Sequence, residues 1–433
     1  MTLFHIIQAV TVALTWPPEP GVVTIESDEL LKPHSTLREG VVIAQTAPLV
    51  DFVYYDCQTY EPNGVWSCWG DGLAVGDVYY SAIGDHGRLE GNAFLYGYDS
   101  KTKNLQLLTD VSSVIKRPAG HYTPGKIHSR IDLGSDGWLY YSTHRGSTKV
   151  GLNPDAQYEG DWILRHHPEK AETEVVAHNP LPKQCLPASV LDPDRLIFYA
   201  GTADGLNEKP PQFLAYDLKK RRVLFSSPDG PSRAMVFAKS TGKLYFHTSK
   251  GGPEQLLRFD PDKPTELTRI DAVAGLRAAS EETSKGLVYT VDRDQLWVFD
   301  TKTETAREFG PTAVGENDYI TSLDLDPVTE RYLYYVPGAH GGGQRDGSPL
   351  VQLDVKTGAR KVICFLHPIL HERAGYIPMG AYMVAVSPEG DKAYITWNGN
   401  RGATAEDLEN QRKVKFNTCA LTVVHIPESE RQP

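Results

Sequence analysis

The sequence predicts an all-β fold: a seven-bladed β-propeller of four-stranded antiparallel blades. A unit of two hairpins recurs along the chain, it is about 40 to 55 residues long, and seven copies can be counted. The composition agrees, because 22 Tyr and 7 Trp against only 4 Met favour strands over helices. An array of β-sandwiches is the alternative, but the nearly equal length of the units argues against it.

The first half of each unit is a hairpin with an aromatic-rich second strand. A turn containing Asp or Gly joins the two strands, as such turns do in hairpins. Six copies begin at Ile127, Ala188, Ala234, Ala278, Ser322 and Met383. A further copy near residue 74 brings the count to seven.

The second half of each unit is a strand, an Asp-led turn and another strand. The turn positions are Asp99, Asp217, Asp260, Asp300 and Asp354. Asp suits these positions because its side chain bonds the backbone just ahead of it. The last unit has fewer strands of its own, so we expect N-terminal strands, with residues 40–46 as the candidate, to complete it and close the ring. Closure hides the edge strands.

Two regions of unequal size follow from this pattern. Residues 21–433 form a single propeller domain, and residues 1–20 are an apolar segment that is either signal-like or a structured strand or helix. The segment has no Lys or Arg before its apolar part and no clear small-x-small cleavage site. The compartment stays open, with an extracellular or periplasmic location slightly favoured. No run reaches the ~18 apolar residues of a membrane helix, so no membrane span is expected.

Charge and cysteine content exclude several classes of protein. The net charge is −11 and there is no basic block, which argues against a nucleic-acid partner. Five cysteines without a CxxC motif support neither a disulfide scaffold nor a zinc ribbon. Cys57 and Cys68 flank a predicted hairpin and are a candidate pair in a secreted protein, and a buried free thiol at each is the alternative.

The hairpin register places the chemically active residues on one rim of the ring. The innermost strand of a blade begins at the rim where the second strand ends. The catalytic candidates on or near this rim are His86, Tyr122, His128, Arg130, His144 and Arg145. The substrate-binding candidates are Trp69, His121, Lys126, Tyr158, Arg233, Arg277 and His340. Tyr319 and Tyr382 fall on the same rim by the same rule. Each histidine alone is more often structural or solvated, so the argument rests on the set.

A positive pocket is the chemical consequence of this placement. His128 and Arg130 are two apart on a strand and point to one face. If that face is the channel, Arg130 can clamp a carboxylate ligand, whereas the alternative is an Arg paired with acidic neighbours inside the ring. We expect Lys126 and Arg130 to keep His128 neutral, as a general base must be.

Basic groups and tyrosines suit β-elimination from a uronic acid. The cations neutralise the carboxylate, a His or Tyr takes the adjacent proton, and a Tyr or His protonates the leaving oxygen. The individual roles stay open at this point. No GxSxG motif supports a hydrolase triad.

Gly84–Asp85–His86 after the second strand of the first full blade, with the His/Arg/Tyr-rich second blade, resembles the propeller polysaccharide lyases. These are the ulvan-lyase and rhamnose–glucuronate-lyase types, with a related glycosidase group acting on rhamnosyl-glucuronate. The resemblance implies cleavage of an acidic oligo- or polysaccharide, with His86 and His128 as its histidine pair. Its Tyr–Arg pair corresponds to Tyr158 with Arg165 or to Tyr141 with Arg145. A glycoside hydrolase, a sugar dehydratase and a non-catalytic binding propeller are the alternatives.

We expect no required cofactor. A structural Ca²⁺ or Zn²⁺ is kept as an alternative, because Asp85, His86 and His144 could converge and imidazole suits Zn²⁺. No HxH or HExxH spacing supports this site. The sequence leaves the oligomeric state open.

Overall fold

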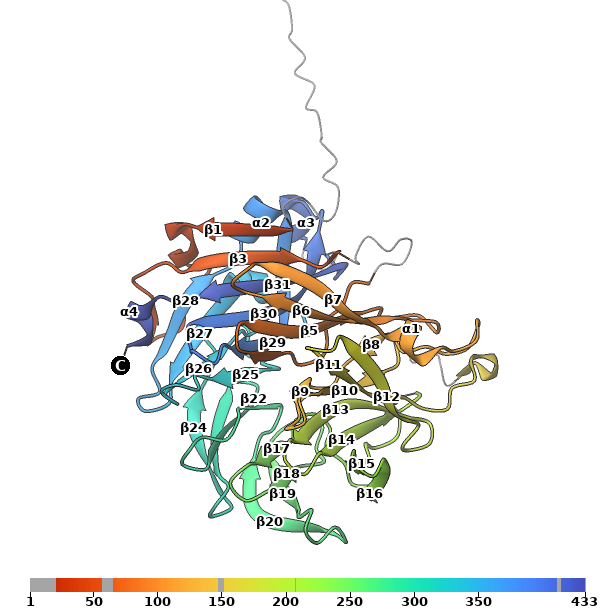
Figure 1. Ribbon diagram of the computed structural model, residues 1–433. Coiled ribbons are helices and arrows are strands. Elements are labelled where there is room, and N and C mark those ends of the chain that lie inside the picture. Colours follow the sequence, from red (N-terminus) through yellow and green to blue (C-terminus); the bar gives the residue numbers. More distant parts are fainter. Residues whose placement is uncertain (1–20, 57–64, 147–151, 207, 411–413, 433) are drawn as a thin grey trace, which may run out of the picture.

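The computed structural model describes residues 21–56, 65–146, 152–206, 208–410 and 414–432. Seven sheets follow one another around a central axis, which confirms the seven-bladed propeller (Figure 1). The apolar segment 1–20 and Cys57 lie outside the described residues, and Cys68 is a buried free thiol. No helix in the described ranges is long and apolar enough to cross a membrane.

Blades one to three come from the first half of the chain. Blade one contains β4 (Leu73–Val75), β5 (Val78–Gly84), β6 (Ala93–Asp99) and β7 (Asn104–Asp110). Blade two contains β8 (Lys126–Ile127), β9 (Asp132–Leu133), β10 (Leu139–His144), β11 (Trp162–His167) and β12 (Glu172–His178). Blade three contains β13 (Gln184–Asp192), β14 (Ile197–Asp204), β15 (Phe213–Asp217) and β16 (Arg222–Ser227).

Blades four to seven continue the ring. Blade four contains β17 (Val236–Ala238), β18 (Lys243–Phe246), β19 (Glu254–Phe259) and β20 (Leu267–Ala274). Blade five contains β21 (Ala278–Ala279), β22 (Leu287–Asp292), β23 (Gln295–Asp300) and β24 (Thr305–Pro311). Blade six contains β25 (Leu323–Leu325), β26 (Tyr332–Tyr335), β27 (Pro349–Asp354) and β28 (Arg360–Phe365). Blade seven contains β29 (Tyr376–Val386), β30 (Lys392–Arg401) and β31 (Thr418–His425).

Two N-terminal strands close the ring, but they are not the predicted ones. β3 (Leu49–Tyr54) pairs antiparallel with β31 and β1 (Val22–Glu26) pairs with β3, which completes blade seven. The candidate segment 40–46 instead supplies β2 (Val41–Ile43), which pairs parallel with β28 at the outside of blade six. Burial explains the difference, because five of the six residues of β3 are buried, as an inner position requires, whereas none of the three residues of β2 is fully buried.

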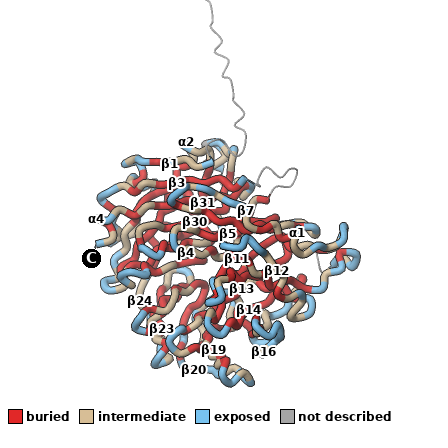
Figure 2. The backbone as a smooth tube through the Cα atoms, viewed as in Figure 1, coloured by how far each residue is buried: buried red, intermediate tan, exposed pale blue. Residues whose placement is uncertain are grey.

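Short helices lie between and beside the blades. They are α1 (Val111–Ile115), α2 (Ile369–Ala374), α3 (Ala405–Glu409) and α4 (Glu428–Arg431), with 3-10 turns at Asp28–Leu31, Pro154–Ala156 and Gly343–Asp346. The core lies between neighbouring sheets, where strands carry buried residues on both faces (Figure 2). Tyr79 of blade one, for example, stacks on Tyr394 of blade seven with ring centroids 4.8 Å apart.

The Asp-led turns form as the sequence predicts. The Asp99 carboxylate accepts the Lys101 N–H at 2.8 Å, and the same contact to the N–H two residues ahead recurs at Asp260, Asp300 and Asp354. The Asp217 carboxylate accepts the N–H three residues ahead, from Lys220. Register also confirms the shared rim, because His144 at the end of β10 lies opposite Lys126 at the start of β8. Residues predicted on that rim from different blades therefore meet at one end of the channel.

Candidate functional site

A cavity of about 530 Å³ occupies the axis of the ring. Inner segments of all seven blades line it, from Asp71 in blade one to Val386 in blade seven. The volume falls within the roughly 300–1,000 Å³ typical of ligand pockets. We call this cavity the channel, and its end beside His128, Arg233, Arg277 and Tyr382 the mouth.

Aromatic and imidazole rings from four blades meet at the mouth. The Trp69 ring centroid lies 5.5 Å from that of His86, 5.8 Å from that of His340 and 5.5 Å from that of Tyr382. The His128 ring lies 5.5 Å from Tyr382 and 5.2 Å from His144. The predicted residues His86, His128, His144, His340 and Trp69 are thus brought together, although they span more than 250 positions of the chain.

The mouth carries four cations that form no ion pair with a described carboxylate: Lys126, Arg145, Arg233 and Arg277. Arg145 donates to the Cys185 thiol at 2.6 Å and to His144 Nε2 at 3.3 Å, and Arg277 Nε donates to the Tyr319 hydroxyl at 2.7 Å. Arg145 Nε, Arg277 Nη2 and Trp69 Nε1 are buried without a hydrogen-bond partner. Buried donors are normally satisfied, so this positive end of an acidic protein fits an anionic ligand.

The histidines of the mouth are held neutral. His86 is exposed at the edge of the mouth, but partial desolvation of its ring beside Trp66 and Trp69 lowers its pKa to about 3, assisted by the charges of Lys126 and Arg145. The pKa values of His128 and His144 are also lowered, by burial first and then by Lys126. Neutral imidazole is the form that accepts a proton.

Hydrogen bonds to carbonyl groups fix the tautomers of two of these histidines. His128 Nδ1 lies 2.9 Å from the Pro187 carbonyl oxygen, so Nδ1 carries the proton and Nε2 is left with its lone pair. His144 Nδ1 lies 2.6 Å from the Arg145 carbonyl oxygen in the same way, but its Nε2 already accepts from Arg145. His128 Nε2 has no partner among the described residues, which distinguishes it from His144 as a proton acceptor.

Lys126 is an unusual amine for its position. Its side chain is buried, and Nζ lies 6.0 Å from the centroid of the Trp69 ring with no carboxylate partner. Burial, followed by the charges of Arg145 and Arg233, lowers its pKa to about 7. Lys126 therefore changes charge near neutral pH and adjusts the charge of the mouth.

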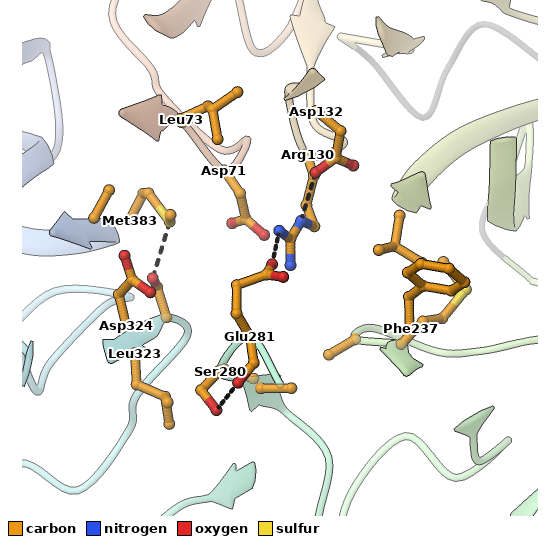
Figure 3. A pocket seen from close by; sticks show the side chains of 18 of the residues that line it. Asp71, Leu73, Arg130, Asp132, Phe237, Ser280, Glu281, Leu323, Asp324 and Met383 are labelled. Carbon is orange, nitrogen blue, oxygen red and sulfur yellow. Dashed lines mark hydrogen bonds and ion pairs between the residues drawn. The ribbon is translucent and has the colours of Figure 1, made fainter. Parts of the chain in front are cut away.

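Arg130 does not belong to the mouth. Its Nη2 binds Glu281 Oε1 at 2.5 Å and its Nε binds Asp132 at 3.3 Å (Figure 3). Lys239 binds the other oxygen of Glu281 at 2.9 Å. These contacts join blade two to blades four and five across the channel. We call this network the floor. Of the two alternatives left open for Arg130, the contacts support pairing with acidic neighbours inside the ring, so Arg130 is not available to clamp a ligand carboxylate.

Tyr122, Tyr158 and His121 are not brought to the mouth rings. Tyr122 is buried, donates to Asp161 at 2.9 Å and stacks on Trp162, and Tyr158 donates to the same carboxylate at 3.3 Å. The insertion after β10 covers Tyr122, whose N–H bonds the Ala156 carbonyl. The backbone N–H of His121 donates to the Pro118 carbonyl oxygen, and its ring contacts none of the described rings of the mouth.

Neither predicted Tyr–Arg pair forms. Arg165 pairs with Glu174 at 2.7 Å and Tyr141 is buried in the core. The pair at the mouth is Tyr319 with Arg277, from blades six and five, and the signal that could have found it is the position of both residues just before inner strands.

The described residues contain no group of three or more His, Cys, Asp or Glu side chains placed to hold a metal ion. Asp85, one of the three expected to converge, instead binds Arg88 at 3.1 Å. Burial raises the pKa of Asp85 to about 6 despite this partner.

Comparison with known proteins supports the fold. No family model and no curated protein matches the chain. Among solved structures, a chain of a "Crystal Structure of Mitotic Checkpoint Complex" matches with a TM-score of 0.50 and 11% identity, over 85% of this chain and 90% of that chain. At this identity the likeness shows the fold alone, so the chemistry of this chain must be argued from its own residues.

Proposed function

We propose that the protein is a carbohydrate-active enzyme, a lyase that cleaves a uronic-acid-containing oligo- or polysaccharide by β-elimination at the mouth. The observation that carries this proposal is the set of four cations without a carboxylate partner among the described residues. Two of them also have buried N–H groups without a hydrogen-bond partner in that part of the chain. An unsatisfied buried donor costs about 1–3 kcal/mol. Arg277 lines the channel, so a ligand carboxylate placed beside its Nη2 would recover that free energy.

Arg277 and Arg233 are the residues best suited to bind the carboxylate. Both line the channel at the mouth, Arg233 is exposed, and Arg277 is held in place by its bond to Tyr319. Neutralising the carboxylate stabilises the negative charge that develops when the adjacent carbon loses its proton. This placement makes the carbon next to the carboxylate acidic enough for a weak base.

His128 is the proposed base. Its Nε2 has a free lone pair, its pKa is lowered, and it lines the channel beside Arg233. In the reaction, Nε2 takes the proton from the carbon next to the carboxylate. The electron pair of that C–H bond forms the C=C double bond, and the bond from the next carbon to the leaving oxygen breaks.

Tyr382 is the proposed acid. Its ring lies 5.5 Å from that of His128, and burial raises its pKa, so the phenol keeps the proton that the leaving oxygen needs. Tyr319 then has a positioning role, because it holds Arg277. The two histidines of the predicted pair then have different roles. His128 acts as the base, and His86, which is exposed beside Trp69, contacts the outer part of the ligand.

A panel of uronate-containing glycans tests the proposal. Elimination creates a conjugated double bond, so ultraviolet absorbance and new reducing ends must increase together. Reducing ends without absorbance would overturn the lyase and assign the site to the hydrolase alternative. A panel in which no acidic glycan binds or is cleaved would contradict both and favour a binding propeller.

A further inference from the structure

The channel beneath the mouth contains a carboxylate that the fold does not use. Asp71 lines the channel, yet its carboxylate makes no hydrogen bond or ion pair with a described residue. The neighbouring acids are occupied: Asp132 accepts the Leu191 N–H at 3.1 Å, and Asp324 accepts the Val386 N–H at 2.8 Å. Both contacts join neighbouring blades, whereas Asp71 is free to accept from a ligand.

Asp71 is close to a charged group of the mouth and to one of the floor. Burial raises its pKa to about 6, against the opposing charges of Arg130 in the floor and Arg277 in the mouth. Figure 3 shows its carboxylate directed into the channel beside Arg130 and Glu281. The channel thus offers an unpaired donor, Arg277 Nη2, at one level and an unpaired acceptor at the next.

We propose that the sugar ring of the anionic ligand enters the channel, and that Asp71 accepts hydrogen bonds from its hydroxyl groups while the carboxylate stays at the mouth. Asp71 is then the residue that selects polyhydroxylated acids over other anions. A carboxylate accepts from two neighbouring hydroxyls, and a site built to bond a hydroxyl discriminates strongly against ligands that lack it. This inference rests on the proposed function, because it uses the same bound uronate.

Two ligands of equal charge and ring size distinguish the contact of the carboxylate at the mouth from the contact of the hydroxyl groups with Asp71. Glucuronate carries hydroxyl groups and cyclohexanecarboxylate does not, so only the former can use Asp71. We expect Asp71→Leu to weaken glucuronate binding about tenfold, the effect of about 1.4 kcal/mol. Binding of cyclohexanecarboxylate should be unchanged, and Asp71→Asn, which keeps one acceptor oxygen, should restore part of the loss. Calorimetric titration of the full-length protein measures both affinities.

Asp324→Asn is the matched control. Asp324 lines the same channel, but its carboxylate is bound to backbone N–H groups. We expect this variant to melt at a lower temperature and to keep the wild-type ratio of the two affinities.

Three outcomes would count against the inference. If Asp71→Leu weakens both ligands equally, or neither, while the wild-type protein still eliminates a uronate glycan, the assignment of Asp71 is overturned and the lyase survives. If the wild-type protein neither binds glucuronate nor cleaves any uronate glycan, the proposed function fails as well.

Discussion

Arginines face the propeller axis at two levels with opposite surroundings. At the floor, Arg130 is bound by Glu281 and Asp132, and Lys239 shares Glu281. At the mouth, Arg233 and Arg277 have no carboxylate within ion-pair distance among the described residues. The arginines of both levels lie on or just before inner strands, so neither the residue type nor the strand direction distinguishes the floor from the mouth. The carboxylates already present decide which arginine holds the ring together and which is available to a ligand.

The largest expected effect is on catalysis at the mouth. His128→Ala should lower turnover by about 10²–10⁴-fold, the usual contribution of a general acid or base, with little change in melting temperature. His144→Ala should behave differently, because both nitrogens of His144 are bonded inside the protein. We expect it to lower the melting temperature clearly. A stable His128→Ala variant with full activity would remove His128 from the mechanism.

The next effect concerns the anion. Arg277→Gln should cost about 2–5 kcal/mol of glucuronate binding, because a buried charge pair is lost. Titration calorimetry with wild-type protein and variant gives the difference. Unchanged affinity would mean that the carboxylate binds elsewhere. It would contradict the view that the mouth arginines, unlike Arg130 of the floor, are available to a ligand.

Arg130→Met tests whether the floor stabilises the fold without taking part in anion binding. It removes charged hydrogen bonds to Glu281 and Asp132, and we expect a loss of about 2 kcal/mol in the free energy of unfolding. Cyclohexanecarboxylate should still bind at the mouth. Denaturant titration measures the first quantity. A variant as stable as the wild type but unable to bind the anion would reverse the assignment of the two levels.

Lys126 makes stability depend on pH. Its pKa falls from 10.5 to about 7 on folding, so between these values the unfolded chain holds a proton that the folded chain does not. With respect to this group, the free energy of unfolding is therefore highest above about pH 10.5. It decreases as the pH falls from there, and the loss is complete once the pH has fallen through about 7. Lys126→Met should raise the melting temperature most at low pH. A difference from the wild type that is equal at all pH values would contradict this.

The smallest effect concerns a residue outside the mouth. Tyr122→Phe removes one hydrogen bond to Asp161, which keeps its bond from Thr143, so we expect a loss of about 1 kcal/mol in stability and unchanged turnover. Thermal unfolding and the absorbance assay together check this. A large loss of turnover would return Tyr122 to the catalytic candidates.

The sequence by itself determined the blades and the rim that the candidate residues share. Hairpin length and Asp-led turns are local properties, and the turns form in the structure from Asp99 to Asp354. The shared rim follows from the hairpin alone, so the meeting of His86, His128 and His340 could be expected before any coordinates. The tautomers of His128 and His144 could not, because they depend on the Pro187 and Arg145 carbonyl groups.

Only the tertiary structure decided how residues distant in sequence pair. Arg130 and Glu281 are 151 positions apart, and no local pattern distinguishes Arg130 from Arg277. Likewise, β3 closes the ring because its residues are buried and those of β2 are not. The segment after β10, which contains Ala156, covers Tyr122. The physical reason is common to all three. Hydrogen-bond register within a hairpin is fixed by neighbours in the chain, whereas charge pairing and burial are fixed by neighbours in space.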